Sequence, residues 1–154
     1  MEILLDVMCG GLVAYLRMCG HDTAYAGDRD LEADDALLVA AKAEDRTLVT
    51  RDVQLATRAD ASILLESREV EAQLAELASA GVDLSLEGDP SRCGRCNGPL
   101  EAVDPAASTP EYAPDPGEFA VWRCRDCGQH FWRGSHWARV ERTLEAVRDA
   151  SRRE

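Results

Sequence analysis

Four cysteines in the second half of the chain have the spacing of a metal site. Cys93 and Cys96 form one C-x-x-C pair, and Cys124 and Cys127 form a second pair after 27 intervening residues. Two such pairs supply four thiolates, the number and type that hold a tetrahedral structural zinc. The spacing alone also allows two disulfides or four unrelated core cysteines. No signal-peptide pattern opens the chain, which favours a reducing, cytoplasmic location and therefore favours zinc over disulfides.

Aspartates at strand ends and helix starts form the second group of residues that could do chemistry. Asp6 ends an apolar run near the start of the chain, and Asp52 follows a later one. Asp34 and Asp35 begin a predicted helix between them. Right-handed connections between parallel strands bring such positions to one edge of a sheet. Carboxylates that meet there repel one another unless a hard cation such as Mg²⁺ or Mn²⁺ lies among them, which is typical of sites that cut phosphodiesters.

The same aspartates allow two other interpretations. Asp34 and Asp52 each suit the N-cap of a helix, which is a structural role. A phospho-accepting receiver domain also gathers acids at strand ends, but its pattern includes a lysine after a later strand. The only lysine is Lys42, in the middle of a predicted helix, so the receiver is the weaker alternative. Asp6, at the end of an apolar strand, is the hardest of the three to explain as a cap.

The segments that must position these residues alternate between strands and helices through the first half of the chain. Short apolar runs predict buried strands at 3–5, 23–26, 47–50 and 62–65. Apolar residues at helical spacing predict helices at 10–20, from about 34 through Leu37, Leu38 and Ala41, and at 67–81, with a short one after 52. This alternation is typical of an α/β domain with a parallel sheet covered on both faces. Cys9 and Cys19 flank the first helix and are interpreted as buried, inert thiols.

A break in the alternation at 87–90 (EGDP) predicts a boundary between a domain at 1–88 and a smaller module at 89–154. In the module, 119–123 and 129–133 flank the second cysteine pair as predicted hairpin strands. Residues 104–117 contain four prolines, which predict an exposed loop of low order. Apolar residues at helical spacing after Ser135 predict a closing helix.

Charge is distributed unevenly along the 154 residues, whose formal net charge is −12. Residues 1–88 carry 18 acidic and 7 basic side chains, whereas residues 89–154 carry 11 and 10. The second half therefore has arginines to spare for a phosphate backbone. The acidic composition and the single lysine resemble those of halophilic proteins, in which carboxylates keep the surface solvated. No apolar run reaches the length of a membrane span, so we expect a soluble protein with no membrane partner.

Several motifs together resemble the Mut-seven C-terminal RNase family, in which a PIN-like nuclease fold is fused to a zinc ribbon. The matching segments cover almost the whole chain: 6–12 (DVMCGGL), 16–23 (LRMCGHDT), 34–38 (DDALL), 48–52 (LVTRD), 91–100 (SRCGRCNGPL), 122–128 (WRCRDCG) and 131–137 (FWRGSHW). The last segment is the most distinctive. The resemblance implies a PIN-like α/β domain with a parallel central sheet at 1–88, then a zinc ribbon with a C-terminal helix at 89–154.

The resemblance also implies an activity, the hydrolysis of RNA phosphodiester bonds with Mg²⁺ or Mn²⁺, the ribbon helping to bind the RNA. Its catalytic residues and metal ligands would be Asp6, Asp34 and Asp52, beside the structural zinc. A fourth acid, frequent in PIN nucleases, has two candidates, Asp60 and Glu66. The predicted contacts to RNA are Arg17, Arg51, Arg123, Arg125, Arg133 and His136. Planar guanidinium groups suit phosphate, which is the reason for choosing the arginines.

Other functions remain open at this point. A PIN-like fold can persist without cutting, so a non-catalytic module that binds RNA or ribonucleoprotein is the main alternative to the nuclease. A protein-interaction or toxin-like regulator is a third class. His136 lies beside Trp132 and Trp137 and is equally well explained by packing of the ribbon against its helix. Exposed arginines are explained equally well by solvation alone.

Overall fold

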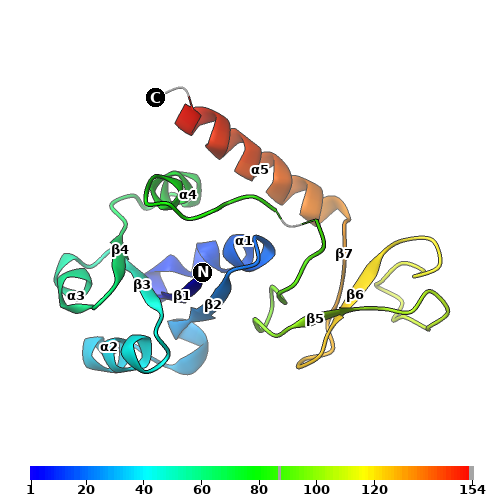
Figure 1. The fold of residues 1–154 in the computed structure, drawn as a ribbon, viewed down its shortest axis with the longest axis horizontal. Helices are drawn as coiled ribbons and strands as arrows, with labels where there is room; N and C mark the ends of the chain where they lie inside the picture. The colour runs from blue at the N-terminus through cyan, green and yellow to red at the C-terminus, as the bar shows by residue number, and fades with distance from the viewer. Residues whose placement is uncertain (87, 153–154) are drawn as a thin grey trace.

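The first part of the chain forms a four-stranded parallel sheet. The computed structural model describes residues 1–86 and 88–152, and Figure 1 shows this sheet surrounded by helices. Its strands are β1 (Glu2–Leu5), β2 (Asp22–Tyr25), β3 (Thr47–Thr50) and β4 (Ser62–Leu64). They are hydrogen-bonded in the order β2-β1-β3-β4, and every pair is parallel. The prediction of a parallel α/β sheet is confirmed.

Alternating side chains on the two central strands divide the apolar core between the faces of the sheet. Ile3 and Leu5 of β1 lie on one face together with Val49 of β3. Leu4 and Leu48 lie on the other face. All five side chains are fully buried. A strand that is apolar on both sides must be covered on both sides, which is why its sequence is a continuous apolar run.

Helices connect the strands and cover both faces. The face of Ile3 is covered by α1 (Val13–Met18) and α4 (Val70–Ser79), and the opposite face by α2 (Asp34–Ala43) and α3 (Val53–Arg58). Two short 3₁₀ segments, η1 (Val7–Leu12) and η2 (Ala26–Arg29), follow β1 and β2. The sequence predicted a single helix opening at Gly10, where the structure has η1 leading into α1. Gly20 and Gly81 follow the ends of α1 and α4 with φ of 88° and 95°, a backbone conformation that favours glycine.

The second part of the chain is a three-stranded antiparallel ribbon. Its strands are β5 (Leu100–Ala102), β6 (Val121–Cys124) and β7 (His130–Trp132), in the order β5-β6-β7. The predicted hairpin is confirmed, with bounds shifted by one or two residues. Strand β5 was not predicted, because three residues are too short to show a period-2 pattern. The proline-rich segment 104–117 contains no helix or strand, as predicted.

A long helix, α5 (Ser135–Arg152), leaves the ribbon and returns to the sheet, and Figure 1 shows it passing above α4. Val140, Leu144 and Val147 recur at helical spacing and are buried in the same apolar cluster as the leucines of α4. The apolar face of α5 therefore completes the core of the sheet, although the helix follows the ribbon in sequence. The predicted boundary at 88 stays a prediction, and Glu87 beside it lies outside the described residues.

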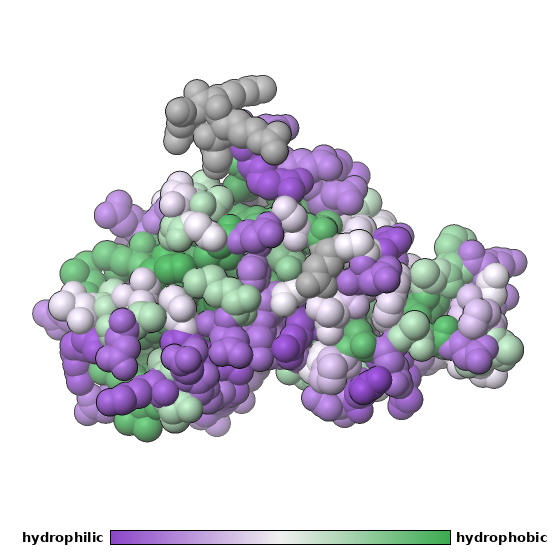
Figure 2. Space-filling model, viewed as in Figure 1, coloured by the Kyte–Doolittle hydropathy of each residue, from purple (hydrophilic) through white to green (hydrophobic). Residues whose placement is uncertain are grey.

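The face of the molecule shown in Figure 2 combines hydrophilic and hydrophobic areas. Figure 2 shows hydrophilic residues, in purple, over much of the lower part of one face, below a band of hydrophobic ones. Charged residues make up 30 % of the chain, so a surface of this kind is expected. In the part of the chain that the structure describes, no helix combines the length and the apolar character needed to cross a membrane.

Candidate functional site

The four cysteines of the two pairs lie together at one end of the ribbon. Their Sγ atoms all fall within 4.8 Å of one another. The Sγ–Sγ distance is 3.6 Å between Cys93 and Cys127 and 3.4 Å between Cys96 and Cys124. Four sulfurs around one zinc ion, each about 2.3 Å from it, lie roughly 3.8 Å apart. The sulfurs are thus gathered near the spacing that a tetrahedral zinc requires, and all four cysteines are free thiols, without the alternative disulfides.

Backbone N–H groups point at the first sulfur of each pair. Cys93 Sγ accepts hydrogen bonds from the N–H groups of Arg95 and Cys96, each at 3.4 Å. The second pair repeats this pattern at Cys124, whose donors again lie two and three residues later in the chain. Donors of this kind stabilise a thiolate, which is the form of cysteine that binds metal.

The turn after each pair depends on one special residue. Asn97 and Gly128, each directly after a pair, have φ of 73° and 79°. Asparagine and glycine are the residues that tolerate this left-handed conformation best. Gly98 has a different role, because a Cβ atom there would lie 2.8 Å from Cys124 Sγ. The absence of a side chain at Gly98 lets the two pairs approach each other.

Protonation of these thiols responds to burial and to the N–H donors. Burial raises the pKa of Cys93 to about 12. At Cys124 burial acts in the same direction, but hydrogen bonds from the N–H groups of Cys127 and Asp126 and from the thiols of Cys96 and Cys127 outweigh it and bring the pKa to about 7. At neutral pH a metal-free Cys93 is therefore a neutral thiol, and binding of a zinc ion would release its proton. The donor set of four sulfurs fits zinc.

The first cysteine pair docks on the outer edge of β2. Arg17 of α1 is only 3 % exposed, and it donates to the carbonyl oxygens of Thr23 and Gly94, each at 3.0 Å. Asn97 accepts from the N–H of Thr23 at 2.9 Å and donates to Asp22 Oδ1 at 2.6 Å. The N–H and C=O of Thr23 that face away from the sheet thus both have hydrogen-bond partners. We refer to these five residues as the docking joint, which fixes the ribbon beside the sheet.

The carboxyl ends of β1 and β3 meet where the strand order reverses. From β1 the chain moves outward to β2, then crosses back to β3 and β4 on the other side. Strands β1 and β3 therefore flank the topological switch point, which is the usual ligand position in a parallel sheet. Asp6 directly follows β1 and is 5 % exposed, and Asp52 lies just beyond the end of β3.

Thr50, the last residue of β3, connects the two aspartates. Its Oγ1 donates to Asp6 Oδ2 at 2.8 Å and accepts from the N–H of Asp52 at 3.1 Å. The other carboxylate oxygen of Asp6 accepts from the N–H of Val7 at 2.6 Å. The structure thus links Asp6 to the backbone of Asp52, whose own carboxylate accepts from N–H groups of α3. We refer to Asp6, Thr50, Arg51 and Asp52 as the switch edge.

Arg51 adds an unused donor to the switch edge. Its Nε atom is buried and has no hydrogen-bond partner among the described residues. Burial and the charge of Asp6 together raise the pKa of Cys9 to about 11, against the opposing charge of Arg51. Cys9 therefore lies within electrostatic range of both charges and is a neutral, buried thiol, as predicted. Arg51 therefore places a cationic side chain, with one buried donor left unsatisfied, beside Asp6.

Asp34 and Asp35 begin α2 and are both exposed. Because α2 follows β2 and runs back toward the start of β3, its first residues lie at the carboxyl edge of the sheet. Asp35 pairs with Arg58 of α3, with 2.7 Å between nitrogen and oxygen. The alternative cap role is confirmed for Asp52, which accepts from two N–H groups in the first turn of α3, but Asp34 caps nothing.

The predicted metal ligands share an edge of the sheet without forming a close cluster. Among the described residues, the four cysteines form the one group of three or more acidic, cysteine or histidine side chains whose ligand atoms lie within 4.8 Å of one another. Asp6, Asp34 and Asp52 are not such a group. Their role as ligands of a catalytic ion stays a prediction.

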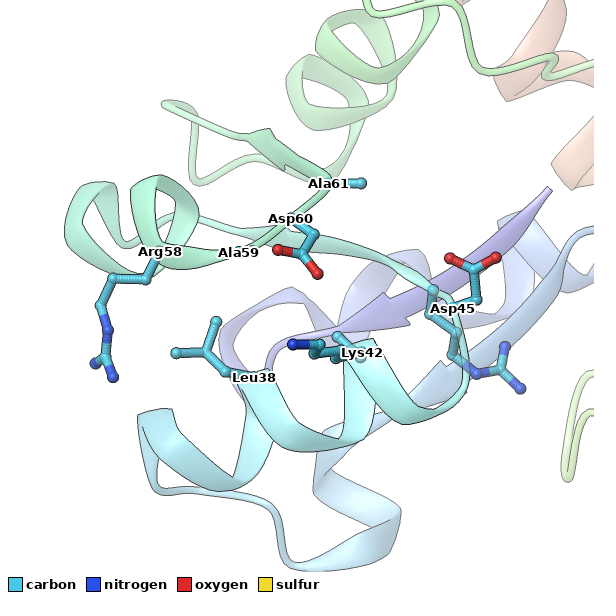
Figure 3. A pocket seen from close by; sticks show the side chains of 9 residues that line it. Leu38, Lys42, Asp45, Arg58, Ala59, Asp60 and Ala61 are labelled. Atoms are coloured by element: carbon cyan, nitrogen blue, oxygen red, sulfur yellow. The ribbon is translucent and has the colours of Figure 1, made fainter.

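The two candidates for a fourth acid lie at opposite edges of the sheet. Glu66 follows β4 at the carboxyl edge, where its N–H donates to Glu76 of α4 at 2.7 Å. Asp60 precedes β4 and lines a cavity of about 200 Å³ together with Lys42 (Figure 3). That cavity lies at the amino edge, on the far side of the sheet from Asp6. The position of Glu66 is therefore the closer match to a site at the switch edge.

Three of the predicted RNA contacts lie in different surroundings. Arg17 belongs to the docking joint, so its guanidinium joins two parts of the chain and does not face solvent. Arg123 is exposed on β6. Arg125 is exposed in the following turn and pairs with Glu101 at 3.1 Å. Of these three, Arg123 and Arg125 are accessible to a phosphate.

The distinctive segment 131–137 forms a stack of cationic and aromatic groups. The Arg133 guanidinium carbon lies 5.3 Å from the ring centroid of Trp122 and 6.0 Å from that of Trp137. Arg133 also pairs with Asp89 at 3.2 Å. His136 is exposed in the first turn of α5. Arg133 therefore holds the ribbon against the start of α5.

Two residues of these sites were missed in the sequence. Asn97 directly follows a cysteine pair, and asparagine at a position that requires a left-handed turn was a usable signal. Thr50 ends an apolar strand one residue before R-D, and a lone hydroxyl there is a much weaker signal.

Comparison with known proteins gives one positive finding. A family model described as Mut7-C RNAse domain matches residues 1–144, a range that includes the switch edge, the docking joint and both cysteine pairs. No curated protein and no solved structure matches the chain.

Proposed function

Since the chain belongs to the Mut7-C RNAse domain family, we propose that it is a ribonuclease that hydrolyses RNA phosphodiester bonds at the switch edge with Mg²⁺ or Mn²⁺. The observation that carries this proposal is the position of Asp6 and Asp52 on the two sides of the topological switch point. Ligands of parallel sheets bind at this point. The family description points to RNase-like activity, and the acidic switch edge supplies the residue types that the chemistry needs.

The donor atoms of the predicted site suit a divalent ion. Carboxylate oxygens of Asp6, Asp34 and Asp52 are the hard ligands that Mg²⁺ and Mn²⁺ prefer. Asp6 is buried, and a buried carboxylate needs a compensating charge. The ion, when bound, would activate water and stabilise the charge that develops on the phosphate.

The remaining residues of the switch edge orient the acids and bind the substrate. Thr50 and the N–H of Val7 fix the two oxygens of Asp6, so this carboxylate keeps one orientation. The half-buried guanidinium of Arg51 binds a phosphate oxygen of the RNA. Asp34, on the first turn of α2, supplies a third carboxylate from an exposed position.

The four cysteines hold one structural zinc ion per chain, and the zinc ribbon supports RNA binding. The gathered sulfurs and their N–H donors support this assignment. Residues 89–154 are close to charge balance, whereas residues 1–88 are strongly acidic. RNA therefore approaches along the ribbon with less repulsion.

A second candidate function is a non-catalytic module that binds RNA or ribonucleoprotein. It is favoured by the roles that the aspartates already have in the protein. Both oxygens of Asp6 accept hydrogen bonds from the chain, and Asp52 caps α3. Aspartates used in this way have a structural role even where no bond is cut.

The change Asp6→Asn separates the two candidates. It keeps the shape of the side chain but gives a neutral and poorer metal ligand, so we expect Mn²⁺-dependent cleavage to fall by at least about 100-fold. Binding of RNA without added Mn²⁺ stays equal or improves, because a negative charge facing phosphate is removed. The measurement is cleavage of labelled single-stranded RNA by zinc-loaded protein with and without Mn²⁺. Chelators are avoided because they would remove the zinc as well.

Asp45→Asn is the matched control. Asp45 is exposed before β3, at the opposite edge of the sheet, and its φ of 53° is one that asparagine adopts readily. This variant should cleave like the wild type. Equal cleavage by the wild type, Asp6→Asn and Asp45→Asn would indicate a contaminating nuclease, and the binding module would replace the ribonuclease.

A further inference from the structure

A cleft of about 410 Å³ lies where the ribbon meets α1 and the start of α5. Its aromatic wall is formed by Phe131, Trp132 and Trp137, and Ala14 and Met18 of α1 line it as well. A volume of this size is typical of sites for small planar molecules. None of the four cysteines and no residue of the switch edge lines the cleft, although Gly94 and Arg95 of the first cysteine pair's turn do.

The charge of the cleft is unusual for this chain. Its titratable lining residues are Arg92, Arg95 and His136, and within the described residues no aspartate or glutamate lines it. The chain as a whole has 29 acidic residues. Each of the three cavities compared with it has at least one carboxylate in its wall. A cleft that combines aromatic rings with arginines and excludes acids is complementary to a planar group that carries negative charge.

The aromatic wall is held in place from behind. The ring of Trp132 lies 6.1 Å from that of Tyr112, and Trp137 lies below the guanidinium of Arg133. Side chains that are already fixed lose little conformational entropy when a ligand stacks on them.

Arg95 is the cation most available to a ligand. It is exposed, and Nη1 contacts the neutral amide oxygen of Gln129 at 3.2 Å. Arg92 instead lies 3.5 Å from the carboxylate of Asp22, which offsets its charge. A ligand phosphate at the mouth of the cleft would therefore meet Arg95 first.

We propose that this cleft binds one unpaired nucleobase of single-stranded RNA, stacked on Trp132 and Trp137, with a neighbouring phosphate on Arg95. Stacking on aromatic side chains requires a base that is not paired, so the substrate class is single-stranded. This inference rests on the proposed RNA substrate, and it adds a binding site at the junction of ribbon and sheet. The cleft runs beside α1, and η1 connects α1 to Asp6, so RNA held here lies along the element that leads to the switch edge.

The first test compares two ligands in the absence of added Mg²⁺ or Mn²⁺. One is a short oligouridylate, and the other is an abasic ribose-phosphate oligomer of the same length. We expect the abasic oligomer to bind about 10-fold more weakly and to quench tryptophan fluorescence less, because stacking on aromatic rings contributes substantially per base. Equal affinity for the two oligomers would overturn the proposal.

The second test fills the cleft without removing any contact. Ala14→Phe places a ring inside it, and its matched control, Ala43→Phe, places the same ring at the exposed end of α2. Ala14→Phe should bind the oligouridylate as weakly as the abasic oligomer, whereas Ala43→Phe should not change binding. Arg95→Gln, at an exposed position, tests the cleft without altering packing, and it should lower the slope of log affinity against log salt by about one.

The outcomes separate this inference from the ribonuclease. If Ala14→Phe and Arg95→Gln bind oligouridylate like the wild type while Asp6→Asn loses cleavage, the cleft proposal fails and the ribonuclease stands. If both cleft variants lose base-dependent binding but the wild type cuts no RNA, the cleft stands and the ribonuclease fails. If the wild type binds neither oligomer but binds an apolar peptide in the cleft, the nucleobase is the wrong ligand.

Discussion

The sheet and the ribbon are stabilised by different interactions. Two apolar clusters cover the faces of the sheet, and within the described residues neither cluster includes any residue between 88 and 134. The ribbon buries Val121 and Trp122 together with the sulfurs of Cys93 and Cys124. A unit of this size buries little apolar surface, and a metal bound by its four cysteines would add to its stability. Helix α5 follows the ribbon in sequence but belongs to the sheet by its packing.

The same contrast separates the two candidate sites. Each pair of cysteines gathers its own sulfurs within one tight turn, and the fold has only to bring the two turns together. Asp6, Asp34 and Asp52 come from three separate strand–helix units, and the topology places them on one edge while leaving them apart. The cysteine cluster already has its ligand atoms close together. The three carboxylates depend on a bound ion to bring theirs together.

The largest expected effect comes from removing one zinc ligand. Cys124→Ser leaves three sulfurs, and structural zinc in small modules contributes on the order of 10 kcal/mol of binding free energy. We expect the zinc to be lost and the ribbon to unfold, while the sheet retains its helices. Elemental analysis would show the metal content, and near-ultraviolet circular dichroism would report the tryptophans of the ribbon. One zinc ion per chain in the variant would show that the cysteines are not the zinc ligands, and loss of all helical signal would show that the sheet is not stable alone.

A core substitution in α5 tests which part of the chain the helix belongs to. Leu144 is 1 % exposed and packs with the leucines of α4, so Leu144→Ala should lower the free energy of unfolding by about 2–5 kcal/mol. Zinc content should stay at one ion per chain. Glu141→Ala, on the exposed side of the same helix, is the control and should change stability by no more than about 0.5 kcal/mol. Urea unfolding measures both, and release of zinc by Leu144→Ala without loss of sheet stability would assign α5 to the ribbon.

The smallest effect is expected at the docking joint. Asn97→Gly keeps the left-handed turn but removes the hydrogen bonds to Thr23 and Asp22, so we expect a loss of about 1–2 kcal/mol with the zinc retained. The amide of Thr23 should exchange its hydrogen faster in the variant. An unchanged exchange rate would show that Asn97 does not hold the ribbon to β2.

The joint also responds to pH. Burial raises the pKa of Asp22, but hydrogen bonds from Asn97 and Arg46 outweigh it, so the folded-state pKa lies below its ordinary value. The carboxylate therefore stabilises the folded protein above a pH of about 3.9, and this contribution is lost as the pH falls through the folded-state pKa. In Asn97→Gly the pKa of Asp22 should rise toward the ordinary value. A carbon-13 titration of the Asp22 carboxyl would detect the change.

Sequence patterns predicted the elements that depend on neighbouring residues. The four sheet strands, the helices between them and the cysteine cluster all follow from local apolar periodicity or from spacing within a turn. The docking of the ribbon on β2 was not predictable, because Arg17 meets Gly94, and Thr23 meets Asn97, across 77 and 74 positions of the chain. The link from Asp6 through Thr50 to Asp52 was missed for the same reason, since hydrogen bonds between strands appear only when the strand order is known.

The return of α5 to the sheet has a consequence for synthesis of the chain. A ribosome releases the N-terminal strands and helices first, but Val140, Leu144 and Val147 emerge only after both cysteine pairs. Until then the side of α4 that packs against α5 is uncovered. A nascent chain in that state exposes an apolar surface that chaperones bind and that promotes aggregation. Contacts between segments so distant in sequence also form slowly. Both cysteine pairs emerge before α5, so a zinc ion held by them would be within reach of the nascent chain before the core closes.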